Sequence, residues 1–114
     1  MPLDISVDTL NSTSAVVAIH GSLTLGSNLK MVEGQVQQLI EEGVRKLVLD
    51  LTDCQYSDSA GLGFLIHTYG LVTGQGGTVR LCGVSERVME LLKMTKTDAM
   101  LPCDVDRQAS VGKL

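Results

Sequence analysis

Aromatic residues are nearly absent from this chain of 114 residues, which has no tryptophan, one phenylalanine and two tyrosines. A buried core must therefore be built from aliphatic side chains. Long apolar runs are also missing: nowhere do about 18 consecutive apolar residues occur. The first residues, Met1 to Asp4, contain no basic segment that leads into an apolar one. These absences predict a cytoplasmic protein that does not insert into a membrane.

Cysteine and basic residues are too few, and too scattered, for a disulfide-linked protein, a zinc protein or a nucleic-acid-binding protein. Cys54, Cys82 and Cys103 are odd in number and form no C-x-x-C pair, which predicts reduced core thiols and no zinc site. Nine Lys and Arg stand against thirteen Asp and Glu, giving a net charge of -4 without a basic cluster. This balance argues against binding to nucleic acid. Asp50, Asp53 and Asp58 are too dispersed and lack the partners that a metal site needs, so we expect no metal and no cofactor.

What remains is an ordinary globular composition, with 44% hydrophobic and 19% charged residues. Its length suits one core, so residues 1–114 are predicted to form a single domain. Period-2 alternation and β-branched runs predict strands, whereas apolar stripes at helical spacing predict helices. The expected strands are residues 3–7, 15–19, 45–50 and 78–82, with a further edge strand at 99–101 before Pro102. The expected helices are 27–42, the segment from Ser59 to about 72, a helix that Ser85 caps and whose C-terminal end carries Lys93 and Lys96, and 106–112.

The order is thus β-β-α-β-α-β-α-(β)-(α), which indicates an α/β fold with a mixed sheet of four to five strands and about four helices. Ser27 or Asn28 is expected to cap the first helix, which Gly43 ends. The methionines at 31, 89 and 94 are predicted to pack in the core. Once the helices are packed on the sheet, no exposed apolar stripe remains to bind a second copy, so we expect a monomer.

The most informative stretch is residues 54–66, where a buried strand passes into an apolar helix through small polar residues. Ser57 and Asp58 are both good N-cap residues, which places Ser59 in the first helical turn, where a phosphate is tolerated. Gly61 and Gly63 each cost roughly 1 kcal/mol of helix propensity against alanine. We therefore expect a close approach there, either to the sheet beneath or to a partner above.

The run Asp58-Ser59-Ala60-Gly61-Leu62-Gly63, after a strand that ends Asp50-Leu51-Thr52-Asp53, resembles the phosphorylation motif of the STAS superfamily, and more narrowly that of the anti-sigma factor antagonists. The resemblance covers about residues 3 to 101. It implies the STAS fold and phosphorylation of Ser59. Two positions depart from the family pattern: Ala60 replaces a common Ser or Thr, and Thr24 replaces the aspartate of a Gly-x-Leu-Asp stretch.

The resemblance also implies a function and partners. When unphosphorylated, such a protein binds an anti-sigma factor that is also a serine kinase and so releases the sigma factor; phosphorylation ends the binding, and a PP2C-type phosphatase reverses it. Carried over to this chain, the docking surface is expected at the loop after the second strand and at the start of the Ser59 helix. Its members are Ser22, Thr24, Ser57, Asp58, Ser59, Ala60, Gly61 and Leu62.

Two other functions are alternatives to this one: a STAS module without a phosphorylation switch, and a serine hydrolase. A STAS module that docks without a phosphorylation switch, in a signalling scaffold or a lipid-transport complex, remains open because of Ala60 and Thr24. A serine hydrolase is disfavoured because Ser57 stands where the G-x-S-x-G signature has its first glycine. His67 lies about two turns, roughly 12 Å, from Ser59 along the helix, too far to act as its base. His20, at a strand end, is expected to be an ordinary rim residue, so we expect no enzyme activity.

Overall fold

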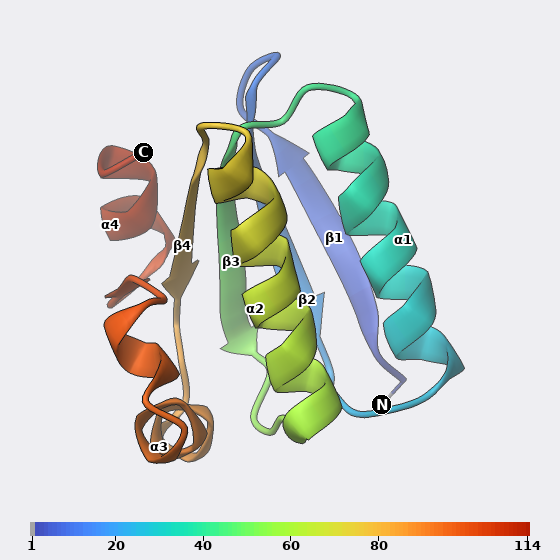
Figure 1. The fold of residues 1–114 in the computed structure, drawn as a ribbon, viewed down its shortest axis with the longest axis vertical. Helices are drawn as coiled ribbons and strands as arrows, with labels where there is room; N and C mark the ends of the chain where they lie inside the picture. The colour runs from blue at the N-terminus through green and yellow to red at the C-terminus, as the bar shows by residue number, and fades with distance from the viewer. Residues whose placement is uncertain (1) are drawn as a thin grey trace.

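Five strands form one mixed sheet in the computed structural model, which describes residues 2–114 (Figure 1). The strand order is β1-β2-β3-β4-β5; β1 runs antiparallel to β2, and the other neighbours are parallel. The strands are β1 (Asp4–Thr9), β2 (Ser14–His20), β3 (Lys46–Asp53), β4 (Thr78–Cys82) and β5 (Cys103–Asp104). The helices are α1 (Ser27–Glu41), α2 (Ser59–Gly74), α3 (Glu86–Met94) and α4 (Arg107–Gly112), with a 3-10 turn, η1, at Thr97–Ala99. The predicted α/β class and element order are confirmed.

The helices cover both faces of the sheet. α1 and α2 lie side by side across one face (Figure 1), and the aliphatic main core fills the space between them and the strands. On β3 the alternate residues Leu47, Leu49 and Leu51 belong to this core. Val48 instead points to the other face, into a smaller cluster that Val111 of α4 helps to cover. The central strand is therefore covered on both sides, as its continuous apolar sequence predicts.

One buried carboxylate fixes the C-terminal part to the sheet. The side chain of Asp104 is 1% exposed and accepts hydrogen bonds from Arg80 Nε at 2.6 Å, Ser110 Oγ at 2.6 Å and Lys113 Nζ at 2.8 Å. The bond from Arg80, supported by Lys113 and Ser110, holds the pKa of Asp104 well below its ordinary value of 3.8, although burial works in the opposite direction. This network ties α4 to β4 and β5.

The predicted edge strand at residues 99–101 is wrong. The amides of Met100 and Leu101 both donate to the carbonyl of Thr97, at 3.0 Å, so this segment closes on itself as a turn. Pairing begins only at Pro102, whose carbonyl accepts from Leu81 N at 2.8 Å. Because proline has no N–H to donate, the strand proper follows it, as β5.

Two smaller predictions are also wrong. Neither Ser27 nor Asn28 caps α1: the N-cap is Gly26, with no side-chain hydrogen bond. Met94 is 81% exposed and Met31 50% exposed, so neither is a core residue, whereas Met89 does pack against the core. The buried side of α3 carries Val88 and Leu92; Met94 lies two positions, about 200°, beyond Leu92 and so faces outward.

Other predicted helix ends are confirmed. Gly43, at φ +112°, follows the last residues of α1. Ser85 caps α3. The predicted final helix is present as α4, and its N-cap is Asp106. No helix within residues 2–114 is long and apolar enough to cross a membrane.

Candidate functional site

Ser59 is the first residue of α2 and is exposed. The carboxyl end of β3 leads to it through residues 54–58. Of the two predicted caps, Asp58 is the N-cap: its Oδ1 accepts a hydrogen bond from Gly61 N at 2.9 Å. Ser57 is buried instead, and its Oγ donates to the carbonyl of Asp58 at 3.0 Å. The cap thus fixes where the helix starts and leaves the Ser59 side chain at the surface.

Asp58 also joins the helix start to the loop that follows β2. Its second oxygen, Oδ2, accepts from Leu25 N at 2.9 Å, and its amide donates to Leu23 O at 3.1 Å. Leu23 N in turn donates to Tyr56 O at 3.0 Å. The amide donors of Leu25 and Gly61 lower the pKa of Asp58 because they stabilise the charged carboxylate. The loop and the helix start therefore form one continuous surface.

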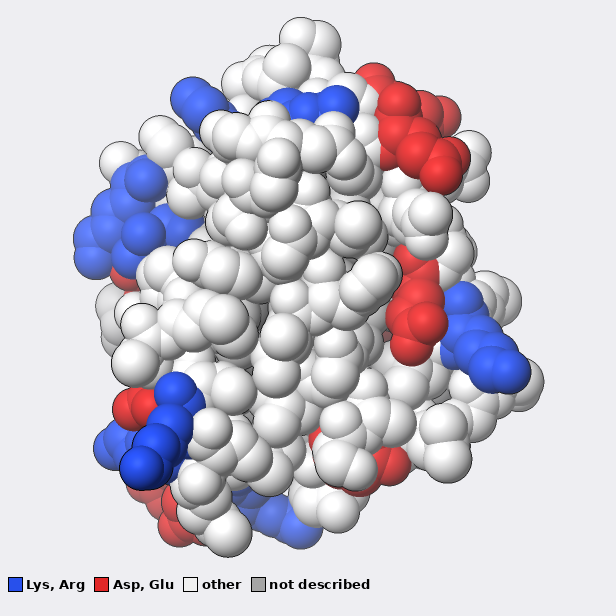
Figure 2. Space-filling view, in the orientation of Figure 1, with Lys and Arg blue, Asp and Glu red and all other residues white. Residues whose placement is uncertain are grey.

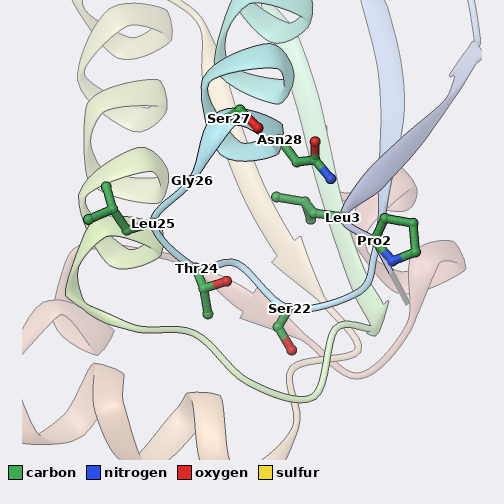
Figure 3. A pocket seen from close by; sticks show the side chains of 8 residues that line it. All are labelled: Pro2, Leu3, Ser22, Thr24, Leu25, Gly26, Ser27 and Asn28. Carbon is green, nitrogen blue, oxygen red and sulfur yellow. The ribbon is translucent and has the colours of Figure 1, made fainter.

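Two hollows flank this junction. The first, about 310 Å³, is lined by the loop and by α1, and it contains the predicted residues Ser22 and Thr24 (Figure 3). The second, about 370 Å³, is lined by Ser57, Asp58 and Ser59 together with α3. The structure thus brings both predicted segments together. The remaining predicted residues offer little surface: Ala60 is half-buried, and Gly61 and Leu62 are buried.

Several residues of the second hollow were not expected from the sequence. Tyr56 lies on its wall, and the Arg87 guanidinium carbon is 4.8 Å from the centroid of the Tyr56 ring. Ser85 Oγ donates to Gln55 O at 3.3 Å, which holds the start of α3 beside residues 54–58. The other lining residues come from α3: Glu90, Leu91 and Met94. No sequence signal pairs segments about thirty residues apart in this way.

Comparison with known proteins assigns the family. The STAS domain model matches residues 4–109. The chain belongs to the STAS-domain family. This STAS domain is also 33% identical over 94 residues to the anti-sigma-B factor antagonist of Bacillus subtilis (strain 168), covering 82% of this chain and 84% of the relative. The resemblance that was predicted from the motif around Ser59 is therefore confirmed.

Solved structures share the fold at low identity. The anti-sigma factor antagonist SpoIIAA in its unphosphorylated form superposes with a TM-score of 0.79, at 14% identity, over 93% of this chain and 92% of that one. The phosphorylated form of SpoIIAA, described as a Bacillus cell fate determinant, gives a TM-score of 0.74 at 11% identity, over 93% and 96% of the two chains. At these identities the likeness concerns the fold.

The two glycines of the motif have different surroundings in this STAS domain. A Cβ on Gly61 would collide with the carbonyl oxygen of Leu23 and with Ser57 Oγ, and would lie 2.6 Å from Leu23 Cβ. Gly61 is therefore required by the close approach of α2 to the loop beneath it. A Cβ on Gly63 would meet nothing within 4 Å. The fold itself gives no reason for glycine there.

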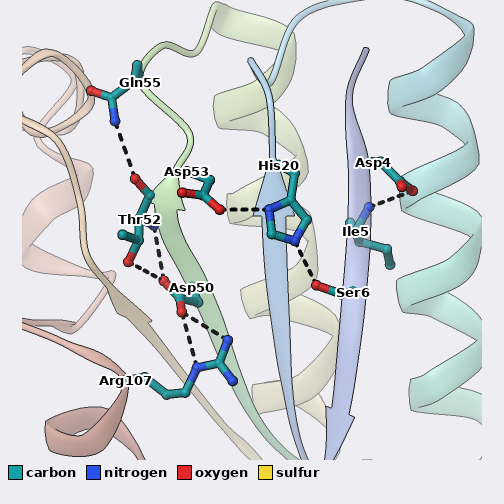
Figure 4. A network of polar contacts seen from close by, with 9 residues as sticks. All are labelled: Asp4, Ile5, Ser6, His20, Asp50, Thr52, Asp53, Gln55 and Arg107. Carbon is teal, nitrogen blue, oxygen red and sulfur yellow. Dashed lines mark hydrogen bonds and ion pairs between the residues drawn. The ribbon is translucent and has the colours of Figure 1, made fainter. Parts of the chain in front are cut away.

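His20, the candidate base for Ser59, forms hydrogen bonds with other side chains. His20 Nε2 lies 2.7 Å from Ser6 Oγ, and His20 Nδ1 lies 2.9 Å from Asp53 Oδ2 (Figure 4). These three side chains form a ladder across β1, β2 and the end of β3. Both ring nitrogens of His20 therefore have partners other than Ser59, whereas a nucleophilic serine needs a base within hydrogen-bond reach.

Proposed function

We propose that this STAS domain is an anti-sigma factor antagonist controlled by phosphorylation of Ser59. Unphosphorylated, it binds an anti-sigma factor that is also a serine kinase, in the cytoplasm, and so frees the sigma factor. Phosphorylation of Ser59 ends this binding, and a PP2C-type phosphatase restores it. The observation that carries the proposal is the position of Ser59: exposed, first in α2, and at the mouth of a hollow beside the loop of Ser22 and Thr24.

The fold has room for the phosphate. A phosphoserine carries about -1.5 to -2 charges, and the first turn of a helix is where an anion is best received. α2 contains no Lys, Arg, Asp or Glu, and the face that carries it is uncharged in its middle, with the charged side chains at the margins (Figure 2). Phosphorylation would add this charge at the start of α2, next to Asp58 and in the same hollow as Arg87 and Glu90. The phosphorylated SpoIIAA, which has the same fold, supports a switch that leaves the fold intact.

Apolar side chains beside the motif supply a docking surface. Leu25, on the loop tied to Asp58, is 77% exposed, and Met94, in the hollow with Ser59, is 81% exposed. Leu25 lines the first hollow and Met94 the second, so a partner that covers both hollows would bury both side chains. The bare surface at Gly63 continues this region along α2. Docking over Ser59 would bury the phosphate, and a coupling of about 1 to 3 kcal/mol would weaken binding about 5- to 150-fold.

The proposal is tested first on protein recovered from its native cells under several growth conditions, by intact mass and fragment mapping. We expect phosphate on Ser59 in a fraction that changes with condition. If Ser59 is unmodified in every condition, the proposal fails. The better hypothesis is then a module that docks constitutively, in a signalling scaffold or a lipid-transport complex.

Partner binding is tested next with phosphoserine placed genetically at position 59. The matched control carries phosphoserine at Ser12, an exposed residue of the β1–β2 turn. Against the serine kinase captured by Ser59→Ala, phosphoserine at 59 should weaken binding at least about 5-fold, whereas phosphoserine at 12 should not. Equal weakening by both would show a general effect of charge and would contradict a switch at Ser59.

A further inference from the structure

Arg87 is an arginine with no acidic partner in the part of the chain that the structure describes. Arg80 pairs with Asp104, and Arg107 pairs with Asp50 and Asp8. Arg87 makes no ion pair of this kind within residues 2–114 and instead lies over the ring of Tyr56, 4.8 Å from its centroid. An exposed guanidinium on an aromatic face is held weakly. Its planar set of N–H donors thus remains available for an anion.

The fold puts this arginine in the same hollow as Ser59. Tyr56, Ser59 and Arg87 all line the second hollow, and Ser85 Oγ fixes the start of α3 against Gln55 O at 3.3 Å. Arg87 stands two residues after Ser85, on the first turn of α3. Both side chains therefore border the same hollow of about 370 Å³, which puts a phosphate on Ser59 and the Arg87 guanidinium at one site.

We propose that Arg87 is the intramolecular partner of the phosphate on Ser59. This inference rests on the proposed function and adds the residue of the chain that binds the phosphate on Ser59. The guanidinium leaves the Tyr56 ring and pairs with two phosphate oxygens, an arrangement for which arginine is better suited than lysine. Phosphorylation then changes the hollow in two ways: it adds negative charge at Ser59, and it withdraws a cation from Tyr56.

The charges around the phosphate set the direction of the test. Asp58 and Glu90 line the same hollow and raise the second pKa of the phosphate, because they repel its dianion. Arg87 opposes them. Removal of Arg87 should therefore raise this pKa, whereas removal of a cation outside the hollow should not change it.

The experiment places phosphoserine at position 59 genetically and follows its titration by 31P NMR. We expect Arg87→Ala to raise the second pKa of the phosphate by about one unit, the lower end of the shift that a nearby opposite charge produces. Arg87→Lys should restore part of the shift, because it keeps the charge and loses the planar fork. Lys93→Ala is the matched control, since Lys93 is on α3 but lines a different hollow, and it should leave the pKa unchanged.

The Tyr56 ring gives a second readout. In the unmodified protein the ring current should shift the arginine side-chain protons above the ring, and phosphorylation should abolish that shift. An unchanged phosphate pKa in Arg87→Ala, or an Arg87 side chain that stays on the ring after phosphorylation, would overturn the inference. Because the phosphoserine is introduced without the kinase, this result is independent of whether cells phosphorylate Ser59, which tests the proposed function separately.

Discussion

Replacement of Gly61 and Gly63 by alanine should change stability in opposite directions. Both glycines lie near the start of α2, and alanine raises helix propensity by up to about 1 kcal/mol at each. The difference lies in what the new methyl group meets. At Gly61 it meets the carbonyl oxygen and Cβ of Leu23 and the hydroxyl of Ser57; at Gly63 it meets no atom within 4 Å.

The collision at Gly61 is costly because its main partner is backbone. The carbonyl of Leu23 is held by the amide of Asp58 at 3.1 Å, so it cannot move without loosening the junction between loop and helix. Overpacking of this kind typically costs about 1 to 3 kcal/mol. With the propensity gain subtracted, Gly61→Ala should destabilise the fold by about 1 kcal/mol, and Gly63→Ala should stabilise it by up to about 1 kcal/mol.

Urea unfolding followed by far-UV circular dichroism measures both variants against the parent. We expect the midpoints of Gly61→Ala and Gly63→Ala to fall on either side of the parent's midpoint, with equal slopes. Their free energies of unfolding should differ by the overpacking cost, about 2 kcal/mol, which is roughly a thirtyfold change in the unfolding equilibrium. If Gly61→Ala is as stable as Gly63→Ala, then the close approach of α2 to the loop does not constrain this position, and the reasoning is refuted.

Two further predictions concern carboxylates. Asp58→Ala should lower the free energy of unfolding by about 1 to 2 kcal/mol, because it removes both the helix cap and the tie to Leu25; an unchanged urea midpoint would contradict this. Asp104→Asn should cost about 1 to 3 kcal/mol near neutral pH. Since the folded-state pKa of Asp104 is below its ordinary value of 3.8, its contribution is complete above that value and is lost as pH falls through the folded pKa. The stability gap between parent and Asp104→Asn should therefore close in acid, and a gap that is constant with pH would argue against the network.

Local patterns in the sequence predict most of the fold. The apolar stripe of α1 and the continuous apolar run of β3 specify a helix and a buried strand with no need of long-range information. Caps whose donors lie three residues on, such as those at Ser85 and Asp106, are also readable. The prediction fails at residues 99–101, where the amides of Met100 and Leu101 donate to Thr97 O, and at Met94, where the outcome depends on which side of a short helix is buried.

The candidate site likewise has one part that the sequence predicts and one part that it does not. Its motif and the exposure of Ser59 follow from the helix start that Asp58 specifies. The placement of Leu25 and Arg87 does not, because each is brought to the motif by a contact about thirty residues away in sequence, one through Asp58 Oδ2 and the other through the ring of Tyr56. Such contacts depend on strand order and on loop packing, and neither produces a periodic pattern of residues in the sequence.

By itself, then, the sequence determined the order of elements, the α/β class and the residue at the helix start that belongs to the family motif, since these depend on interactions between near neighbours along the chain. Only the tertiary structure decided which glycine the fold requires and which side chains share a hollow with Ser59. The physical reason is that Gly61 is constrained by Leu23, and Ser59 is joined by Arg87, through packing between separate elements.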